Sequence, residues 1–199
     1  HLGKVGKYNR YTSKMLRRYH ATHLKKGMDS WKKAGKPVET EEMDQFTMSD
    51  GTTIKMFSIK HASIRMQIAD KWVYFDPVTT ATLPETDYTK LPKADFIFFT
   101  HDHFDHLDSL AVAQLEKEET VIITNASGQM ALGKGEVMAN GDSLTIADGW
   151  TVEAVPAYNI SENKLQFHPK GRDNGYVLTV NGFRIYVGGD LENIPELEN

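Results

Sequence analysis

Three histidines and two aspartates fall within six consecutive residues of this chain, in the segment THDHFDHL that begins at Thr100. Imidazole nitrogens and carboxylate oxygens are ligands that zinc, iron and manganese take in proteins. In an extended chain, side chains two positions apart point the same way, so His101 and His103 can bind one cation together. Where the chain then bends, Asp105 and His106 can turn toward a neighbouring cation. The segment therefore predicts ligands for two divalent transition-metal ions. Zinc is the preferred candidate, and manganese or iron are alternatives.

Two such ions have a known chemical use. When they lie roughly 3.5 to 4 Å apart they lower the pKa of a bound water toward about 7 and polarise the bond under attack. We therefore expect a hydrolase in which a metal-bound hydroxide attacks the substrate, with Asp105 as a catalytic residue. The alternative is a charged surface turn that binds nothing.

The elements around this segment must place its side chains. The apolar run ADFIFFTH, residues 94–101, is typical of a strand buried on both faces, and it leads directly into the histidines. Residues 107–115 have helical spacing, with Asp108 near the start to favour the helix dipole. A strand-to-helix loop therefore holds the ligands. Because a buried strand leads directly into this loop, the metal site is favoured over the surface turn.

Further strands and turns are expected on both sides of that loop. Turn residues separate short β-type runs, and Asn-Gly is a strong hairpin signal. The expected elements are three strands within 53–78 with tight connections at 49–51 and 69–71, a strand over 120–125, a short helix over 127–133, a hairpin over 142–158 turning at Asp148-Gly149, a long loop over 159–174, and a hairpin over 175–190 turning at Asn181-Gly182.

Composition and charge limit the remaining classes. The 199 residues, 40% of them hydrophobic, suffice for one sizeable core, and the lack of cysteine excludes disulfides and thiolate ligands. Residues 1–36 carry 11 Lys/Arg and one acidic residue, a net +10, which leaves −14 on the remainder. We therefore expect a basic N-terminal arm or helix with a linker over 1–45 and a main domain over 46–199. The arm could contact nucleic acid or a membrane, or simply pack on its own acidic domain.

The segment HDHFDH resembles the HxHxDH signature of the metallo-β-lactamase fold superfamily. Residues 59–78, IKHASIRMQIADKWVYFDPV, look like the opening hairpins of that family. Residues 167–190, FHPKGRDNGYVLTVNGFRIYVGGD, look like the block before the bridging aspartate in its UlaG-like, lactonase-related branch. The resemblance implies an α/β fold, a four-layer αββα sandwich with a dinuclear metal site at one edge of its two sheets.

Roles follow from the resemblance at matching positions. His101 and His103 match ligands of the first metal, and Asp105 and His106 match ligands of the second. Asp190, at the end of the strand FRIYVGGD, matches the carboxylate that bridges both metals; the alternative is an aspartate of a strand-end turn.

The residues around these ligands match the family pattern less regularly. Asp76 matches an aspartate that orders the loops beneath the site, and His61 could line the pocket or be a core histidine. Where the family commonly places a third histidine on the first metal, this chain has Tyr158 and Asn159. His168 could replace that ligand or be an ordinary loop histidine.

The last expectations concern the substrate and the C-terminal part of the fold. Lys170 and Arg172 could hold a small anionic ester, lactone or phosphoester near the metals, or be exposed loop charges. The family's fold continues beyond the equivalent of Asn199, so its C-terminal part is expected to be missing here or supplied by another chain, such as a second copy. A nucleic-acid or phospholipid processing enzyme and a non-catalytic binding protein of the same fold remain alternatives.

Overall fold

A computed structural model of the chain describes residues 43–83 and 85–198. The expectations for the basic arm over 1–36, and for the linker up to residue 42, lie outside the described residues. The chain divides into compact units of residues 1–44 and 45–199, and the second unit holds the candidate site. None of the helices in the described part is long and apolar enough to cross a membrane.

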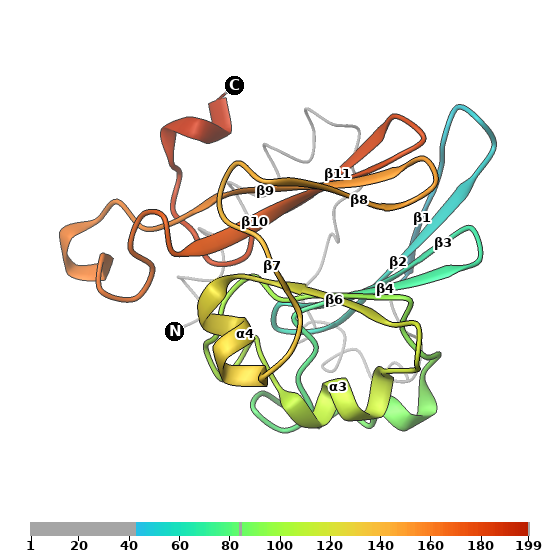
Figure 1. The fold of residues 1–199 in the computed structure, drawn as a ribbon, viewed down its shortest axis with the longest axis horizontal. Coiled ribbons are helices and arrows are strands. Elements are labelled where there is room, and N and C mark those ends of the chain that lie inside the picture. The colour runs from blue at the N-terminus through green and yellow to red at the C-terminus, as the bar shows by residue number, and fades with distance from the viewer. Residues whose placement is uncertain (1–42, 84, 199) are drawn as a thin grey trace, which may run out of the picture. The chain divides into compact units, whose positions relative to one another are not determined.

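Two β-sheets form the body of the second unit (Figure 1). The first sheet has seven strands in chain order: β1 Met43–Thr47, β2 Thr53–Lys60, β3 Ser63–Ile68, β4 Lys71–Phe75, β5 Phe96–Phe98, β6 Val121–Thr124 and β7 Glu136–Val137. Strands β2 to β4 pair antiparallel, whereas β4 to β7 pair parallel. The second sheet is antiparallel in the order β11-β10-β9-β8, formed by β8 Ser143–Ala147, β9 Trp150–Ala157, β10 Asp173–Val180 and β11 Phe183–Val187.

Helices cover one face of the first sheet. Helices α3 (Ser109–Leu115) and α4 (Ala126–Leu132) lie on the face turned away from the second sheet (Figure 1). One core cluster fills the space between the sheets, with Phe98 and Tyr176 in ring contact, and another packs α3 against β5. The α/β class is confirmed, and helix, sheet and sheet are three of the four expected layers. Among the described residues, the helical elements after α4 are the short 3-10 turns η2 Glu162–Lys164 and η3 Pro195–Glu198, and a third, η1 Tyr88–Lys90, precedes α3.

Local signals in the sequence predicted most of these elements. The hairpin turn at Asn181-Gly182 has positive φ at both residues, as its sequence predicts. The side chain of Asp108 caps α3 by accepting a hydrogen bond from the Leu110 N–H. Three features were not predicted: the short strands β1 and β7, the turn between β2 and β3 at residues 61–62, and the start of β10 at Asp173, two residues before the expected hairpin.

The two sheets are joined where β5 ends. The Asn174 N–H, on β10, donates a hydrogen bond to the Thr100 carbonyl at 3.0 Å, and the Tyr176 hydroxyl donates to the Phe99 carbonyl at 2.9 Å. Gly189, after β11, has φ +64°, and a Cβ there would lie 2.8 Å from Thr100 Cβ. Only glycine therefore lets the chain after β11 approach Thr100 this closely.

Candidate metal centre

The loop that follows β5, residues 100–107, holds four of the predicted ligands. Its backbone folds back through hydrogen bonds that the N–H groups of His106 and Leu107 donate to the His103 carbonyl, both at 2.9 Å. His101 and His106 are fully buried, while His103 is half-buried. This fold-back brings His106 beside His101.

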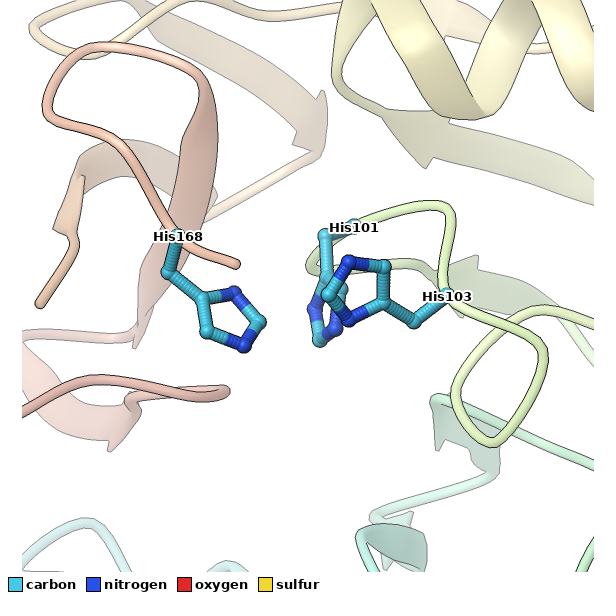
Figure 2. Close-up of side chains that lie close together, drawn as sticks. All are labelled: His101, His103 and His168. Carbon is cyan, nitrogen blue, oxygen red and sulfur yellow. The ribbon is translucent and has the colours of Figure 1, made fainter. Parts of the chain in front are cut away.

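A first ligand group consists of His101, His103 and His168 (Figure 2), whose ligand nitrogens lie within 4.8 Å of one another. The ring centroid of His168 is 4.8 Å from that of His101 and 4.7 Å from that of His103. His168 belongs to the loop before β10, so it reaches the other two histidines from the second sheet. Between the two alternatives left by the sequence, the geometry supports the ligand.

Asp190 lies between this group and His106. Its Oδ1 is 3.4 Å from His106 Nε2, and its Oδ2 is 3.5 Å from His168 Nε2. Ligand atoms of one tetrahedral zinc ion lie about 3.3 to 3.4 Å apart when each is about 2.0 to 2.1 Å from the metal. The two oxygens of Asp190 therefore have suitable spacing to share one cation with His168 and another with His106.

A second group is formed by His61, Asp105 and His106, whose ligand atoms also lie within 4.8 Å of one another. His61 is at the turn between β2 and β3, and its side chain is 41% exposed, so it is not a core histidine. Asp105 is partly exposed. The loop after β5 thus contributes to both groups, as its spacing predicts.

Asp76 orients two of the ligand histidines. Its Oδ2 accepts hydrogen bonds from His106 Nδ1 at 2.8 Å and from Thr100 Oγ1 at 2.7 Å, and its Oδ1 accepts from the Thr100 N–H at 2.8 Å. Thr100 Oγ1 in turn accepts from His101 Nδ1 at 3.0 Å. These bonds keep a proton on Nδ1 of both imidazoles, so Nε2 is the nitrogen that is left to bind a metal, as ligation through Nε2 requires.

Asp173 has the same relation to His168. This carboxylate is buried, accepts from His168 Nδ1 at 2.9 Å, and binds Arg172 through Nε at 2.7 Å and Nη2 at 2.9 Å. Neither Asp173 nor Thr100 was singled out from the sequence. The available signal for Asp173 is an acidic residue a few positions after a candidate ligand, at the start of a strand.

Two buried nitrogens test whether a cation fits. Within the described part of the chain, His101 Nε2 and His106 Nε2 are fully buried and have no hydrogen-bond partner, since Asp190 Oδ1 at 3.4 Å does not form one with His106. Buried polar atoms without partners are rare and costly. A divalent cation at each Nε2 would satisfy both atoms, so the residues fit the metals that the loop predicts.

The charges of the site agree with a set of cation ligands. Burial, together with the neighbouring His106, lowers the pKa of His101 to about 3, so its imidazole is neutral at pH 7. Burial also opposes charge on His106, but the carboxylates of Asp190 and Asp76 outweigh it and raise its pKa to about 10. The pKa of Asp190 is lowered, because His106 and the other imidazoles outweigh its burial. Without a cation, a proton on His106 therefore balances the carboxylates.

The other predicted site residues lie around the loop that carries His168. The Asn159 N–H donates to the His168 carbonyl at 2.8 Å, and its side chain donates to the Lys164 carbonyl, so Asn159 supports the loop and belongs to neither ligand group. The Tyr158 hydroxyl donates to Glu196 at 2.8 Å, and Lys170 binds the same carboxylate at 2.9 Å.

Arg172 lies beside one of the ligand histidines. Its Nη2 lies 3.5 Å from His103 Nε2, while the rest of the guanidinium is held by Asp173 and the Phe167 carbonyl. Its charge is therefore largely compensated within the protein.

Comparison with known proteins gives a consistent result. A family model described as a β-lactamase superfamily domain matches residues 71–199. A metal-dependent hydrolase of Anaeromyxobacter sp. (strain K) is 34% identical over 122 residues, which are 55% of this chain and 44% of the relative. A second one, from Thermococcus onnurineus, is 24% identical over 73% of this chain and 65% of its own length. The chain thus spans less than two thirds of the length of these relatives.

Solved structures extend the comparison. A protein of Parabacteroides distasonis described as a metal-dependent hydrolase is 42% identical, with a TM-score of 0.75, over 79% of this chain and 70% of that one. An isothiocyanate hydrolase from Delia radicum gut bacteria is 21% identical with a TM-score of 0.55, over 72% of this chain and 66% of that one, and shows likeness of fold alone.

Proposed function

Since this chain belongs to the metallo-β-lactamase superfamily, we propose that it is a metal-dependent hydrolase with two divalent transition-metal ions, zinc first, in the groups described above. The relatives named metal-dependent hydrolases support this proposal. The observation that carries it is the position of Asp190, whose two oxygens each face the Nε2 of a different ligand histidine.

Each side chain then has a defined part. His101, His103 and His168 would hold the first cation, Asp105 and His106 the second, and Asp190 both. Bound there, the cations would activate a water and polarise the bond under attack.

The chain's own residues shape the rest of the reaction site. Asp76 and Asp173 keep the ligand imidazoles oriented, and the complete burial of His101 and His106 excludes water from the inner side of the site. Asp105 and Asp190 have 27% and 47% of their side-chain surface exposed, so substrate enters over these carboxylates. Asp105 is our candidate to accept a proton from the attacking water, because it is partly open to solvent and belongs to the second ligand group.

We propose a small anionic ester, lactone or phosphoester as substrate, in keeping with the UlaG-like, lactonase-related branch indicated by residues 167–190. Arg172 lies 3.5 Å from His103, but Asp173 already compensates most of its charge, so it gives the anionic preference limited support. Lys170 gives it less support because Glu196 already binds its ammonium group.

Metal content and hydrolysis test the proposal together. Protein stripped with a chelator and titrated with Zn²⁺ or Mn²⁺ should bind about two ions per chain. The loaded protein should hydrolyse at least one member of a panel of lactones, esters and phosphodiesters, each in an anionic and an uncharged form. Fewer than two ions per chain would refute the dinuclear proposal.

Variants of the metal loop make the test specific. His103→Ala and Asp105→Ala should each abolish hydrolysis while circular dichroism shows folded sheets. Asp102→Ala is the matched control, because Asp102 is an exposed carboxylate of the same loop that belongs to neither ligand group. Retained activity in either of the first two variants would contradict the assignment.

A second candidate function rests on charge. The net +10 of residues 1–36 would attract an anionic polymer or membrane, so processing of nucleic acid or phospholipid is the alternative reaction. Binding of such substrates should then fall steeply with salt and should weaken when residues 1–36 are deleted. Binding that the deletion leaves unchanged would remove this candidate.

A further inference from the structure

His61 is held at the edge of the metal loop by a short turn. Strand β2 ends at Lys60 and β3 begins at Ser63, so only residues 61 and 62 connect them. His61 has φ +41°, a conformation that is uncommon for residues other than glycine. A strained residue in a tight turn persists where the surrounding structure fixes it.

The residues on both sides of His61 anchor this turn. The Lys60 ammonium group is buried and donates to the carbonyls of Thr79, at 2.5 Å, and Thr82, at 2.8 Å. Ser63 Oγ donates at 2.6 Å to the carbonyl of Asp76, the residue that orients His106. Through Ser63 and Asp76, the position of His61 is therefore tied to the position of His106, the ligand that it faces.

The imidazole of His61 points into the second ligand group. Its Nε2 lies 3.1 Å from Asp105 Oδ2, and its ring meets the ring of His106 edge-on at 5.2 Å between centroids. The 3.1 Å separation is close to the roughly 3.3 Å expected between two ligand atoms of one tetrahedral zinc ion.

The positions of the ligand atoms indicate a role for His61 at the second cation. The ligand atoms of His61, Asp105 and His106 all lie within 4.8 Å of one another, so these three side chains can hold one cation and leave a position open for water, as in catalytic zinc sites. The ligand atoms of His101, His103 and His168 form the first group, and His101 also lies within 4.8 Å of His106 and Asp190. Among the described residues, His61 is the further imidazole that the second group contains.

We propose that His61 is a ligand of the second cation, contributed by the turn between β2 and β3. This inference rests on the proposed function, because it requires two cations. The second position is then built from three separate parts of the chain: this turn, the loop after β5, and the end of β11.

Metal titration of His61→Asn tests the proposal without relying on activity. Asparagine tolerates positive φ, so the turn should still form, and circular dichroism checks the fold. Competition with a chromophoric chelator should show unchanged affinity for the first Zn²⁺ ion and at least tenfold weaker affinity for the second. Co²⁺ spectra should show loss of the second ion's absorption. Ser58→Ala, an exposed position on β2, is the control and should bind both ions like the wild type.

The outcomes separate this inference from the proposed function. Two ions bound with wild-type affinities by His61→Asn would overturn the role of His61 and leave the dinuclear proposal standing. Fewer than two ions on the wild type would overturn both. His61→Gln separates ligation from a hydrogen bond to Asp105: its amide can donate to a carboxylate but is a poor zinc ligand. Wild-type affinity for the second ion in that variant would also overturn the role of His61 as a ligand.

Discussion

Replacement of Asp76 by asparagine should disable the candidate site without touching a ligand. Asp76 is buried and has φ +45°, which asparagine tolerates, so the substitution preserves volume and backbone. It replaces Oδ2, which accepts hydrogen bonds from His106 and Thr100, by an amide group that donates. His106 Nδ1 must then accept instead of donate, so Nδ1 loses its proton and the proton that the imidazole keeps lies on Nε2, the atom that would bind a cation.

The expected magnitudes follow from these contacts. Two hydrogen bonds to a buried carboxylate, each about 1.5 to 3 kcal/mol, give way to weaker neutral ones, so the free energy of unfolding of the metal-free protein should fall by about 2 to 4 kcal/mol. Loss of an outer partner of a ligand histidine should weaken cation binding about 10- to 100-fold.

Three measurements follow the effect. Urea denaturation gives the stability, chelator competition gives the affinity, and nitrogen NMR of the imidazoles identifies whether Nδ1 of His106 carries a proton. Asp142→Asn is the control, because Asp142 accepts one backbone hydrogen bond in an exposed turn. A cation affinity within twofold of wild type, with the His106 proton still on Nδ1, would show that Asp76 does not set the tautomer.

Three further predictions concern the same site. Because the pKa of His106 is raised to about 10, a cation must displace its proton at neutral pH. Chelator competition should therefore show that the affinity for the second cation rises about tenfold per pH unit between pH 7 and 9 and levels off above about pH 10. An affinity that does not change with pH would contradict the assignment. Asp173→Asn should weaken the first cation about 10- to 100-fold by releasing His168, with the second cation's affinity unchanged as the internal control in the same titration. Gly189→Ala should lower the free energy of unfolding by about 2 to 4 kcal/mol in urea, since its φ is +64° and the new Cβ would meet Thr100, and stability equal to wild type would refute that close approach.

The sequence predicted the part of the site that is contiguous. The loop from His101 to His106 could be placed because an apolar strand and a capped helix flank it, and both signals are local. Asp190, which follows the strand that became β11, was predicted through the resemblance to a known family. Residues 167–190 carry that resemblance.

What the sequence did not predict depends on contacts between distant segments. The turn at His61 has no glycine, asparagine or proline to mark it, and its backbone is fixed by Lys60 and Ser63 through partners 13 to 22 residues away. Asp173 begins β10 although aspartate is a poor strand former, because pairing with Ala157 on β9 outweighs that preference. Strand β7 has two residues, too few for any periodic pattern.

The division of the ligands between the two sheets has a thermodynamic consequence. His61 and the loop after β5 belong to the first sheet, whereas His168 and Asp190 flank strands of the second. Cations bound there would act as cross-links between segments more than sixty residues apart, in a chain that has no cysteine to form disulfides. Because these ligands come together only in the folded chain, the cations would stabilise the folded state alone, so the separation of the two sheets would become coupled to metal release.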